Sequence, residues 1–168
     1  RLATRNAVYA IEMKLQVNEN LRSWKKLIDF KELSVDTGLY TYFEGINFYN
    51  ENTAGTVVLD TDFTVGVARD NAGMVEVFLD GSSLFSFDDS ASELAVSSND
   101  ILYFFVDDLA VTGETLTGSV DFIRIHDDAS TFGTTPGARV PESGSTLVIL
   151  ALGLLGCVGG QRWFSRRG

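Results

Sequence analysis

The chain has 168 residues, and its 23 acidic and 13 basic side chains give a formal net charge of −10. This charge argues against nucleic acid or an anionic membrane surface as the partner. The only cysteine, Cys157, lies in an apolar run near the C-terminus, which excludes a disulfide within the preceding domain and any cysteine-based metal site there.

The sequence of residues 1–130 predicts a single domain made of strands. Apolar and polar side chains alternate over residues 9–17 and again over 63–69, a period typical of strands with one buried face. Glu44-Gly45 and Asp80-Gly81 suit two-residue hairpin turns between such strands. The predicted strands are 9–17, 24–30, 38–43, 46–49, 56–59, 63–69, 74–79, 84–87, 101–106 and 119–126.

The second half of this domain contains longer connections. Residues 88–100 are rich in serine and aspartate and are predicted to form a loop, as are residues 107–117. Between them, residues 101–106 (ILYFFV) are almost wholly apolar, which predicts a central strand covered on both faces. Residues 131–139 contain mainly glycine, threonine and proline and are predicted to form a linker.

Ten short strands separated by turn residues predict a β-sandwich or a barrel. Four segments also resemble the concanavalin A-like, LamG-like jelly roll: LIDF at 27–30, the GLY hairpin that begins at Gly38, VFLDGSSLFSF at 77–87 and GSVDFIRI at 118–125. The resemblance implies an all-β jelly-roll sandwich over residues 1–130. It also implies that the usual first strand precedes Arg1, so we expect a truncated N-terminus.

Sequence patterns of common catalytic sites are absent from the chain. Enzymes of this sandwich class that cut glycans use a Glu-x-Asp-x-x-Glu pattern on one strand, which places the two catalytic carboxylates close together. That pattern is missing, as are Gly-x-Ser-x-Gly, His-Glu-x-x-His and the P-loop. The sequence therefore predicts a domain that is not an enzyme and has no catalytic residues. An atypical glycanase of the same fold is the alternative.

Three acidic residues of the 107–117 loop form a candidate metal site: Asp107, Asp108 and Glu114. Ca²⁺ takes six to eight oxygen ligands, and two adjacent carboxylates with nearby backbone carbonyls can supply several of them. The resemblance to LamG-like and related lectin domains, which often bind calcium at loop ends, supports this site. A solvated acidic loop without an ion is the alternative.

Aromatic residues form a candidate sugar-binding surface. Tyr40 and Tyr42 lie on one face of their predicted strand, and Trp24 lies nearby in the sequence. Rings exposed on a sheet face can stack on the apolar side of a sugar. These rings can equally fill the core, because aromatic side chains dominate protein cores.

The C-terminal tail has three parts in order. Residues 140–146 form a polar motif (VPESGST), residues 147–160 form an uncharged apolar run, and residues 161–168 form a basic end. A helix over the apolar run would be about 21 Å long, a short span for a bilayer core of about 30 Å. The arginines after it, Arg162, Arg166 and Arg167, place that end in the cytoplasm. A buried core helix is the alternative.

This tail resembles the PEP-CTERM sorting signal, in particular its VPDSG-type variant from Gram-negative bacteria. The motif residues are Val140, Pro141, Glu142, Ser143 and Gly144. Glu142 stands where the variant usually has Asp, and Ser143 stands where the PEP form has a second Pro. The resemblance implies processing by an exosortase, which cleaves near the motif after transient anchoring in the inner membrane.

The domain and the tail together predict an exported protein of the cell surface or extracellular matrix. Its expected role is a glycan-binding or structural module associated with exopolysaccharide. A periplasmic binding domain that stays anchored in the inner membrane is the alternative to secretion.

Overall fold

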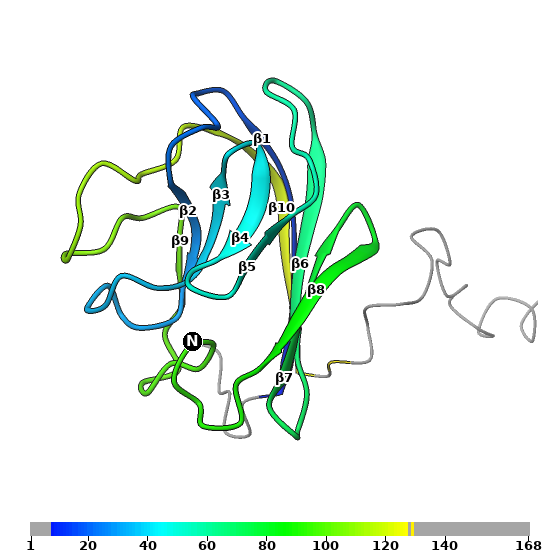
Figure 1. Cartoon of the computed structure of the whole chain (residues 1–168), viewed down its shortest axis with the longest axis vertical. Coiled ribbons are helices and arrows are strands. Elements are labelled where there is room, and N and C mark those ends of the chain that lie inside the picture. The colour runs from blue at the N-terminus through cyan, green and yellow to red at the C-terminus, as the bar shows by residue number, and fades with distance from the viewer. Residues whose placement is uncertain (1–7, 128, 130–168) are drawn as a thin grey trace, which may run out of the picture. The chain divides into compact units, whose positions relative to one another are not determined.

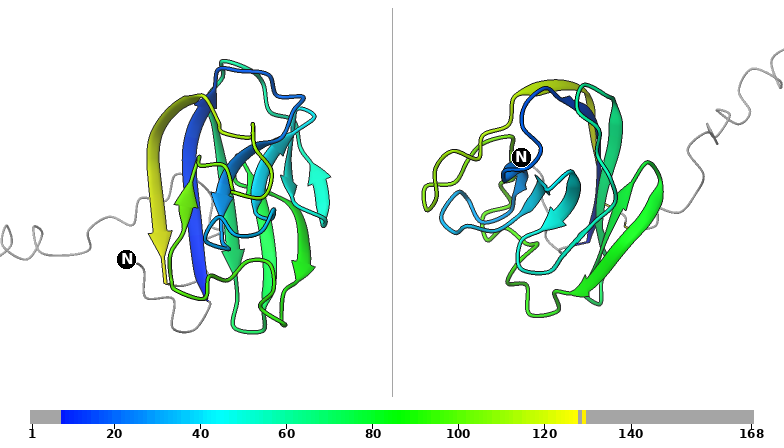
Figure 2. Two further views of the ribbon diagram at one scale, coloured as in Figure 1. Left: turned by 90° about the vertical axis from the view of Figure 1, so that its left-hand side faces the viewer. Right: turned by 45° about the horizontal axis from the view of Figure 1, so that its top comes forward.

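The computed structural model describes residues 8–127 and 129, which form ten strands in two antiparallel sheets. One sheet has the strand order β10-β1-β6-β7-β8 and the other has the order β5-β4-β3-β2-β9. Figure 1 shows the two sheets as facing layers, and the turned views in Figure 2 show the same arrangement. The strands are β1 (Tyr9–Val17), β2 (Lys25–Asp29), β3 (Leu39–Tyr42), β4 (Gly45–Phe48), β5 (Asn52–Ala54), β6 (Phe63–Arg69), β7 (Met74–Leu79), β8 (Ser82–Asp88), β9 (Tyr103–Phe104) and β10 (Gly118–His126).

The core lies between the sheets. It is built from inward-facing side chains, which alternate with outward-facing ones along the strands. In β1, every second residue from Tyr9 to Val17 is buried in this core, as the period-two pattern predicts. The second sheet contributes Leu27, Leu39 and Phe48, which are all fully buried. Strand alternation then directs the neighbouring side chains of β2 to β4 to the opposite face of the second sheet, away from this core.

Two hairpin turns follow the predicted turn chemistry. Asp80 and Gly81 both have positive φ (49° and 78°) between β7 and β8, as expected for this dipeptide. In the β3–β4 hairpin the two positive-φ residues are Phe43 and Glu44 (47° and 62°), so Gly45 begins β4. The predicted Glu44-Gly45 turn is therefore displaced by one residue.

Residues 101–106 do not form the predicted central strand. β9 contains only two residues and lies at the edge of its sheet, and the flanking Ile101 and Val106 are 41% and 44% exposed. Phe105 has a φ of 61°, which is incompatible with a continuing strand. Phe104 and Phe105 pack against the core, so the apolar run reflects the anchoring of a loop.

The predicted strand at 56–59 is also absent. The short edge strand β5 ends at Ala54, and Gly55 follows with a φ of 76°, which turns the chain out of the sheet. Of residues 56–59 only Val57 is buried, and its N–H donates to the carbonyl of Glu44. The edge strand of this region is therefore β5, which ends before the apolar residues 57–59 on which the prediction rests.

The linker 131–139 and the tail 140–168 lie outside the described residues, so their predicted structures stay predictions. Within residues 8–127 and 129, the structure contains no helix long and apolar enough to cross a membrane.

Candidate functional site

The outward face of the second sheet carries polar and aromatic side chains, in contrast to its apolar inward face. Lys26 projects from β2, Tyr40 and Tyr42 from β3, and Asn47 from β4, while Trp24 immediately precedes β2. The loop that joins β9 to β10 passes over this side of the sheet and is seen at the left of Figure 1. The side chains of the loop and the sheet therefore meet here.

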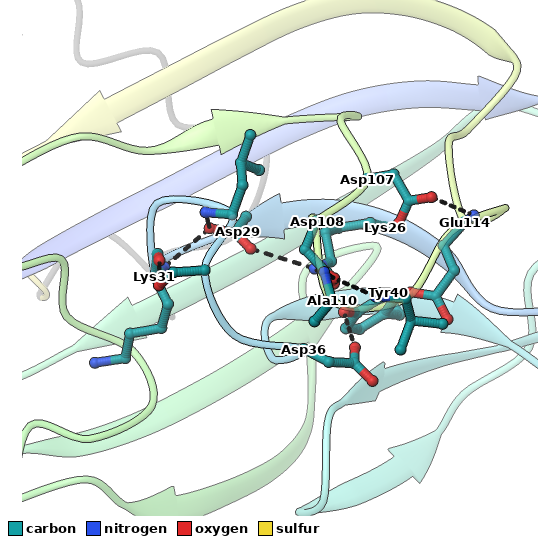
Figure 3. Close-up of polar contacts among 12 residues, drawn as sticks. Lys26, Asp29, Lys31, Asp36, Tyr40, Asp107, Asp108, Ala110 and Glu114 are labelled. Carbon is teal, nitrogen blue, oxygen red and sulfur yellow. Dashed lines mark hydrogen bonds and ion pairs between the residues drawn. The ribbon is translucent and has the colours of Figure 1, made fainter.

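Lys26 is the central residue of this region and is fully buried. Its ammonium lies 3.2 Å from Oδ2 of Asp29 and 2.5 Å from Oδ2 of Asp108. The same ammonium lies 5.1 Å from the centre of the Tyr40 ring. Figure 3 shows these groups converging. A buried ammonium requires such partners, because an unpaired buried charge is strongly destabilising.

The acidic loop is held in place by its own carboxylates. Asp108 Oδ1 accepts hydrogen bonds from the N–H groups of Ala110 and Val111, at 2.7 and 2.8 Å. Asp107 Oδ2 accepts from the N–H groups of Gly113 and Glu114, at 2.6 and 2.9 Å. Burial alone would raise the pKa of Asp108, but its hydrogen bonds from Lys26 and from the loop backbone hold that pKa below its ordinary value.

Asp36 joins this loop from the connection between β2 and β3. The hydroxyl of Tyr40 donates to Asp36 Oδ1 at 2.9 Å and so fixes the carboxylate above the sheet. One carboxylate oxygen each of Asp36, Asp108 and Glu114 lies within 4.8 Å of the others. Figure 3 shows the Glu114 side chain pointing from the loop toward Asp36 and Tyr40.

Glu114 is the electrostatically unusual member of this group. Its side chain is buried, and its Oε2 atom has no hydrogen-bond partner. Burial, followed by the negative charges of Asp36 and Asp107, raises the pKa of Glu114 to about 7. The nearby Lys26 opposes this shift without reversing it.

The structure therefore brings together two of the three predicted metal ligands, Asp108 and Glu114, and adds Asp36. Asp107 instead stabilises the loop backbone. Calcium binding stays a prediction. The donor set fits Ca²⁺ poorly, because Asp108 already receives one ammonium and two N–H groups, which leaves few free oxygen atoms for an ion that takes six to eight.

The aromatic residues form a cluster beside the acidic group. The rings of Trp24 and Tyr42 are stacked, with centroids 3.7 Å apart and planes 9° from parallel, and Tyr49 meets Trp24 edge-on at 5.7 Å. Trp24 and Tyr42 are half-buried, so part of each ring is open to a ligand. Tyr40 is fully buried beneath Trp24, where it contacts Lys26 and Asp36, so it has no surface available for a sugar.

A cleft of about 750 Å³ joins the aromatic and acidic groups. Among the described residues that line it, three are carboxylic acids and none is Lys or Arg. The lining residues are Trp24, Asp36, Tyr42, Asn47, Tyr49, Asn50, Glu51, Asn52, Thr53, Val111 and Glu114. A cleft with apolar ring faces and convergent polar groups has the composition of a small-molecule site.

No protein-family model and no curated protein matches the chain. Solved structures do match its fold. The IT-sialidase CBM40 of Ruminococcus gnavus bound to α2,3-sialyllactose aligns over 73% of this chain and 76% of its own, with 13% identity and a TM-score of 0.54. The Trypanosoma rangeli sialidase in complex with the inhibitor DANA aligns over 75% of this chain and 21% of its own, with 15% identity and a TM-score of 0.52.

The leech intramolecular trans-sialidase is similar over 76% of this chain and 23% of its own, with 14% identity and a TM-score of 0.53. At these identities the likeness concerns the fold alone. The predicted all-β sandwich is thus confirmed, and its two-sheet architecture is similar to that of the aligned parts of these structures.

Proposed function

We propose that the chain is a glycan-binding module and that the cleft on the outward face of the second sheet is its binding site. The observation that carries the proposal is the half-buried Trp24–Tyr42 stack, which opens onto a cleft lined with amide and carboxylate groups. The match to a CBM40 module bound to sialyllactose supports it as a likeness of fold.

The side chains of the cleft suit the two kinds of surface that a sugar ring presents. The open parts of the half-buried Trp24 and Tyr42 rings offer apolar area for the C–H face of a sugar at little cost in conformational entropy. Asn47 and Glu51 offer hydrogen-bonding groups for its hydroxyls, and both line the cleft. Trp24 and Tyr42 are the proposed sugar-contacting rings.

The charge of the cleft disfavours acidic sugars. Sialyllactose, which the CBM40 module binds, carries a carboxylate at neutral pH. In this chain the cleft is lined by Asp36, Glu51 and Glu114 and by no basic side chain among the described residues, so an anionic ligand would be repelled. The proposed ligand is therefore a neutral or cationic glycan, as part of an extracellular polysaccharide.

Isothermal titration of the full chain with neutral and charged oligosaccharides tests the proposal. We expect binding of one or more saccharides, and a loss of roughly tenfold or more in affinity for Trp24→Ala. Phe122→Ala is the matched control, because this partly buried ring lies on β10 of the other sheet, beneath the guanidinium of Arg124. Unchanged binding by Trp24→Ala would contradict the proposed site.

A glycanase is the second candidate, and one observation favours it. Glu114, with a pKa of about 7, lies close to Asp36, and a carboxyl with a raised pKa beside a second carboxylate is the arrangement of glycosidase acids and nucleophiles. We nonetheless propose a binding role without catalysis. Incubation with the bound oligosaccharide separates the two, because release of shorter products that stops in Glu114→Gln would establish hydrolysis.

We further propose that this LamG-like domain is exported, processed by an exosortase at the motif 140–146 and delivered to the cell surface or extracellular matrix. The order of polar motif, apolar run and basic end supports this. Permanent anchoring of the domain in the inner membrane is the alternative. Removal of the tail from the mature protein would support export, and retention of the tail would support the anchor.

A further inference from the structure

Two buried side-chain oxygen atoms of the cleft residues have no hydrogen-bond partner. They are Oε2 of Glu114 and Oδ1 of Asn47, and the two residues are only 8% and 6% exposed. The amide nitrogen of Asn47 donates to the carbonyl of Asn52 at 2.9 Å and to the hydroxyl of Thr53 at 2.7 Å, which identifies the other amide atom as the free acceptor.

These unsatisfied atoms define what a ligand must offer. A buried acceptor without a donor costs free energy, and a ligand that supplies the donor removes that cost. The amide oxygen of Asn47 accepts hydrogen bonds only, and so does Glu114 in its ionised form, which a bound cation favours over the protonated form. Each of these atoms has less than 1 Å² of exposed surface, so a ligand reaches it once the neighbouring side chains shift, and a matching ligand then presents N–H or O–H groups toward Glu114 and Asn47.

The charge balance distinguishes between these two kinds of donor. Lys26 lies beneath the cleft, but its ammonium is already bonded to Asp29 and Asp108. The carboxylates of Asp36 and Glu114 therefore face the cleft without a basic side chain of their own among its lining residues. A cation placed there would gain charge-assisted hydrogen bonds, which are about twice as strong as neutral ones.

The spacing of these carboxylates suits one ammonium group. Their nearest oxygen atoms lie within 4.8 Å of each other. An ammonium that donates two hydrogen bonds of about 2.8 Å at its tetrahedral angle reaches two oxygen atoms about 4.6 Å apart, which is close to this spacing. An ammonium with three donors can thus bridge Asp36 and Glu114.

We propose that the cleft selects a saccharide with free amino groups, such as a glucosamine oligomer that lacks its N-acetyl groups. The ammonium bridges Asp36 and Glu114, a sugar ring contacts the Trp24–Tyr42 stack, and a hydroxyl donates to Asn47. This inference rests on the proposed glycan-binding function and assigns its ligand class. The adjoining aromatic stack favours a saccharide over a basic peptide as the source of the cation.

Titration calorimetry of the full chain at about pH 7 and low salt tests this selectivity. The probes are a glucosamine hexamer, the fully N-acetylated hexamer, α2,3-sialyllactose and trilysine. We expect the glucosamine hexamer to bind about tenfold or more tightly than the N-acetylated one, since a charge-assisted hydrogen bond is lost with the amine. Added salt should reduce this difference, because the ammonium–carboxylate attraction is screened.

Glu114→Gln and Asp36→Asn should each reduce the preference for the free amine, and one control variant and one control ligand guard against a simple loss of folding. Glu76→Gln is the matched control, because Glu76 lies on β7 of the other sheet, and it should keep the full preference. Both cleft variants should still bind the N-acetylated hexamer if they are folded.

Each result has a distinct meaning. Equal affinity for the two hexamers would overturn the amine selectivity and leave the glycan-binding function in place. Absence of binding to every saccharide would overturn both proposals. Binding of trilysine as tightly as the glucosamine hexamer would overturn the assignment to a saccharide.

Discussion

The ammonium of Lys26 lies 2.5 Å from a carboxylate oxygen of Asp108, and both side chains are fully buried. Lys26 belongs to strand β2 and Asp108 to the loop after β9, so the ion pair joins the sheet to the loop that covers it. The backbone N–H of Lys26 also donates to the carbonyl of Glu114 at 2.9 Å. The position of the acidic group therefore depends on one lysine beneath it.

Replacement of this lysine should destabilise the domain strongly. Lys26→Met leaves Asp29 and Asp108 buried without their cation, for which we expect a loss of about 3–5 kcal/mol in the free energy of unfolding, measured by urea denaturation. Adding Asp108→Asn should restore part of the loss. Lys14→Met is the control, because Lys14 forms its ion pairs with exposed partners and should matter far less. Equal losses for the two lysine variants would contradict this account.

Glu114 should make the stability of the domain depend on pH. Its pKa is raised from 4.5 to about 7 in the folded state, so the folded chain binds this proton more tightly than the unfolded chain. The resulting stabilisation is present at low pH and is lost as the pH rises through about 7. We expect a decrease on the order of 1–3 kcal/mol between about pH 5 and about pH 8, and a smaller decrease in Glu114→Gln.

The comparison of variants isolates Glu114 from the other titrating groups. Urea denaturation at both pH values gives the free energy of unfolding. It is measured on the original chain, on Glu114→Gln and on Glu76→Gln. Glu76→Gln should retain the pH dependence of the original chain. The same pH dependence in all three proteins would show that Glu114 does not hold its proton in the fold.

Gly38 is required because of a close backbone approach. It has a φ of 139°, and a Cβ atom built there would lie 2.2 Å from the carbonyl oxygen of Ile28. Gly113 has a similar φ of 103° but no atom within 4 Å of such a Cβ. We expect Gly113→Ala to cost about 1–3 kcal/mol from backbone strain and Gly38→Ala to cost clearly more. Similar unfolding free energies for the two variants would argue against the clash.

The proposed sorting signal predicts the mass of the mature protein. If an exosortase processes the chain, protein recovered from the medium or outer envelope of its host should end within or near residues 140–146. Intact-mass spectrometry of each cell fraction measures this directly. A chain that retains residues 147–168 in the inner membrane would instead support a permanent anchor.

Local sequence patterns were sufficient to predict the regular part of the fold. The predicted bounds of β1, β6 and β7 match the structure, because strict alternation and adjacent turn residues mark both ends of each strand. The predicted central strand at 101–106 is wrong, because apolar composition does not distinguish such a strand from a loop whose aromatic residues are anchored in the core. The positive φ of Phe105 leaves no signal in the composition.

The candidate site was only partly predictable for a related reason. Asp108 and Glu114 share one loop, so sequence proximity suggested their association, whereas Asp36 reaches them from another loop through Tyr40. Alternation correctly placed Tyr40 and Tyr42 on one face, but it could not show that Trp24 and the acidic loop bury Tyr40 and leave Tyr42 partly open. These contacts join segments that are distant in the sequence, so the pattern of a single strand does not predict them.

The most direct test of the account is a nitrogen–proton NMR titration of the full chain with the glucosamine hexamer. We predict that the indole N–H of Trp24, the side-chain amide of Asn47 and the backbone N–H groups around Glu114 shift together as the saccharide is added. Shifts confined to other surfaces, or no shift with any saccharide, would contradict the assignment of this cleft as a glycan-binding site.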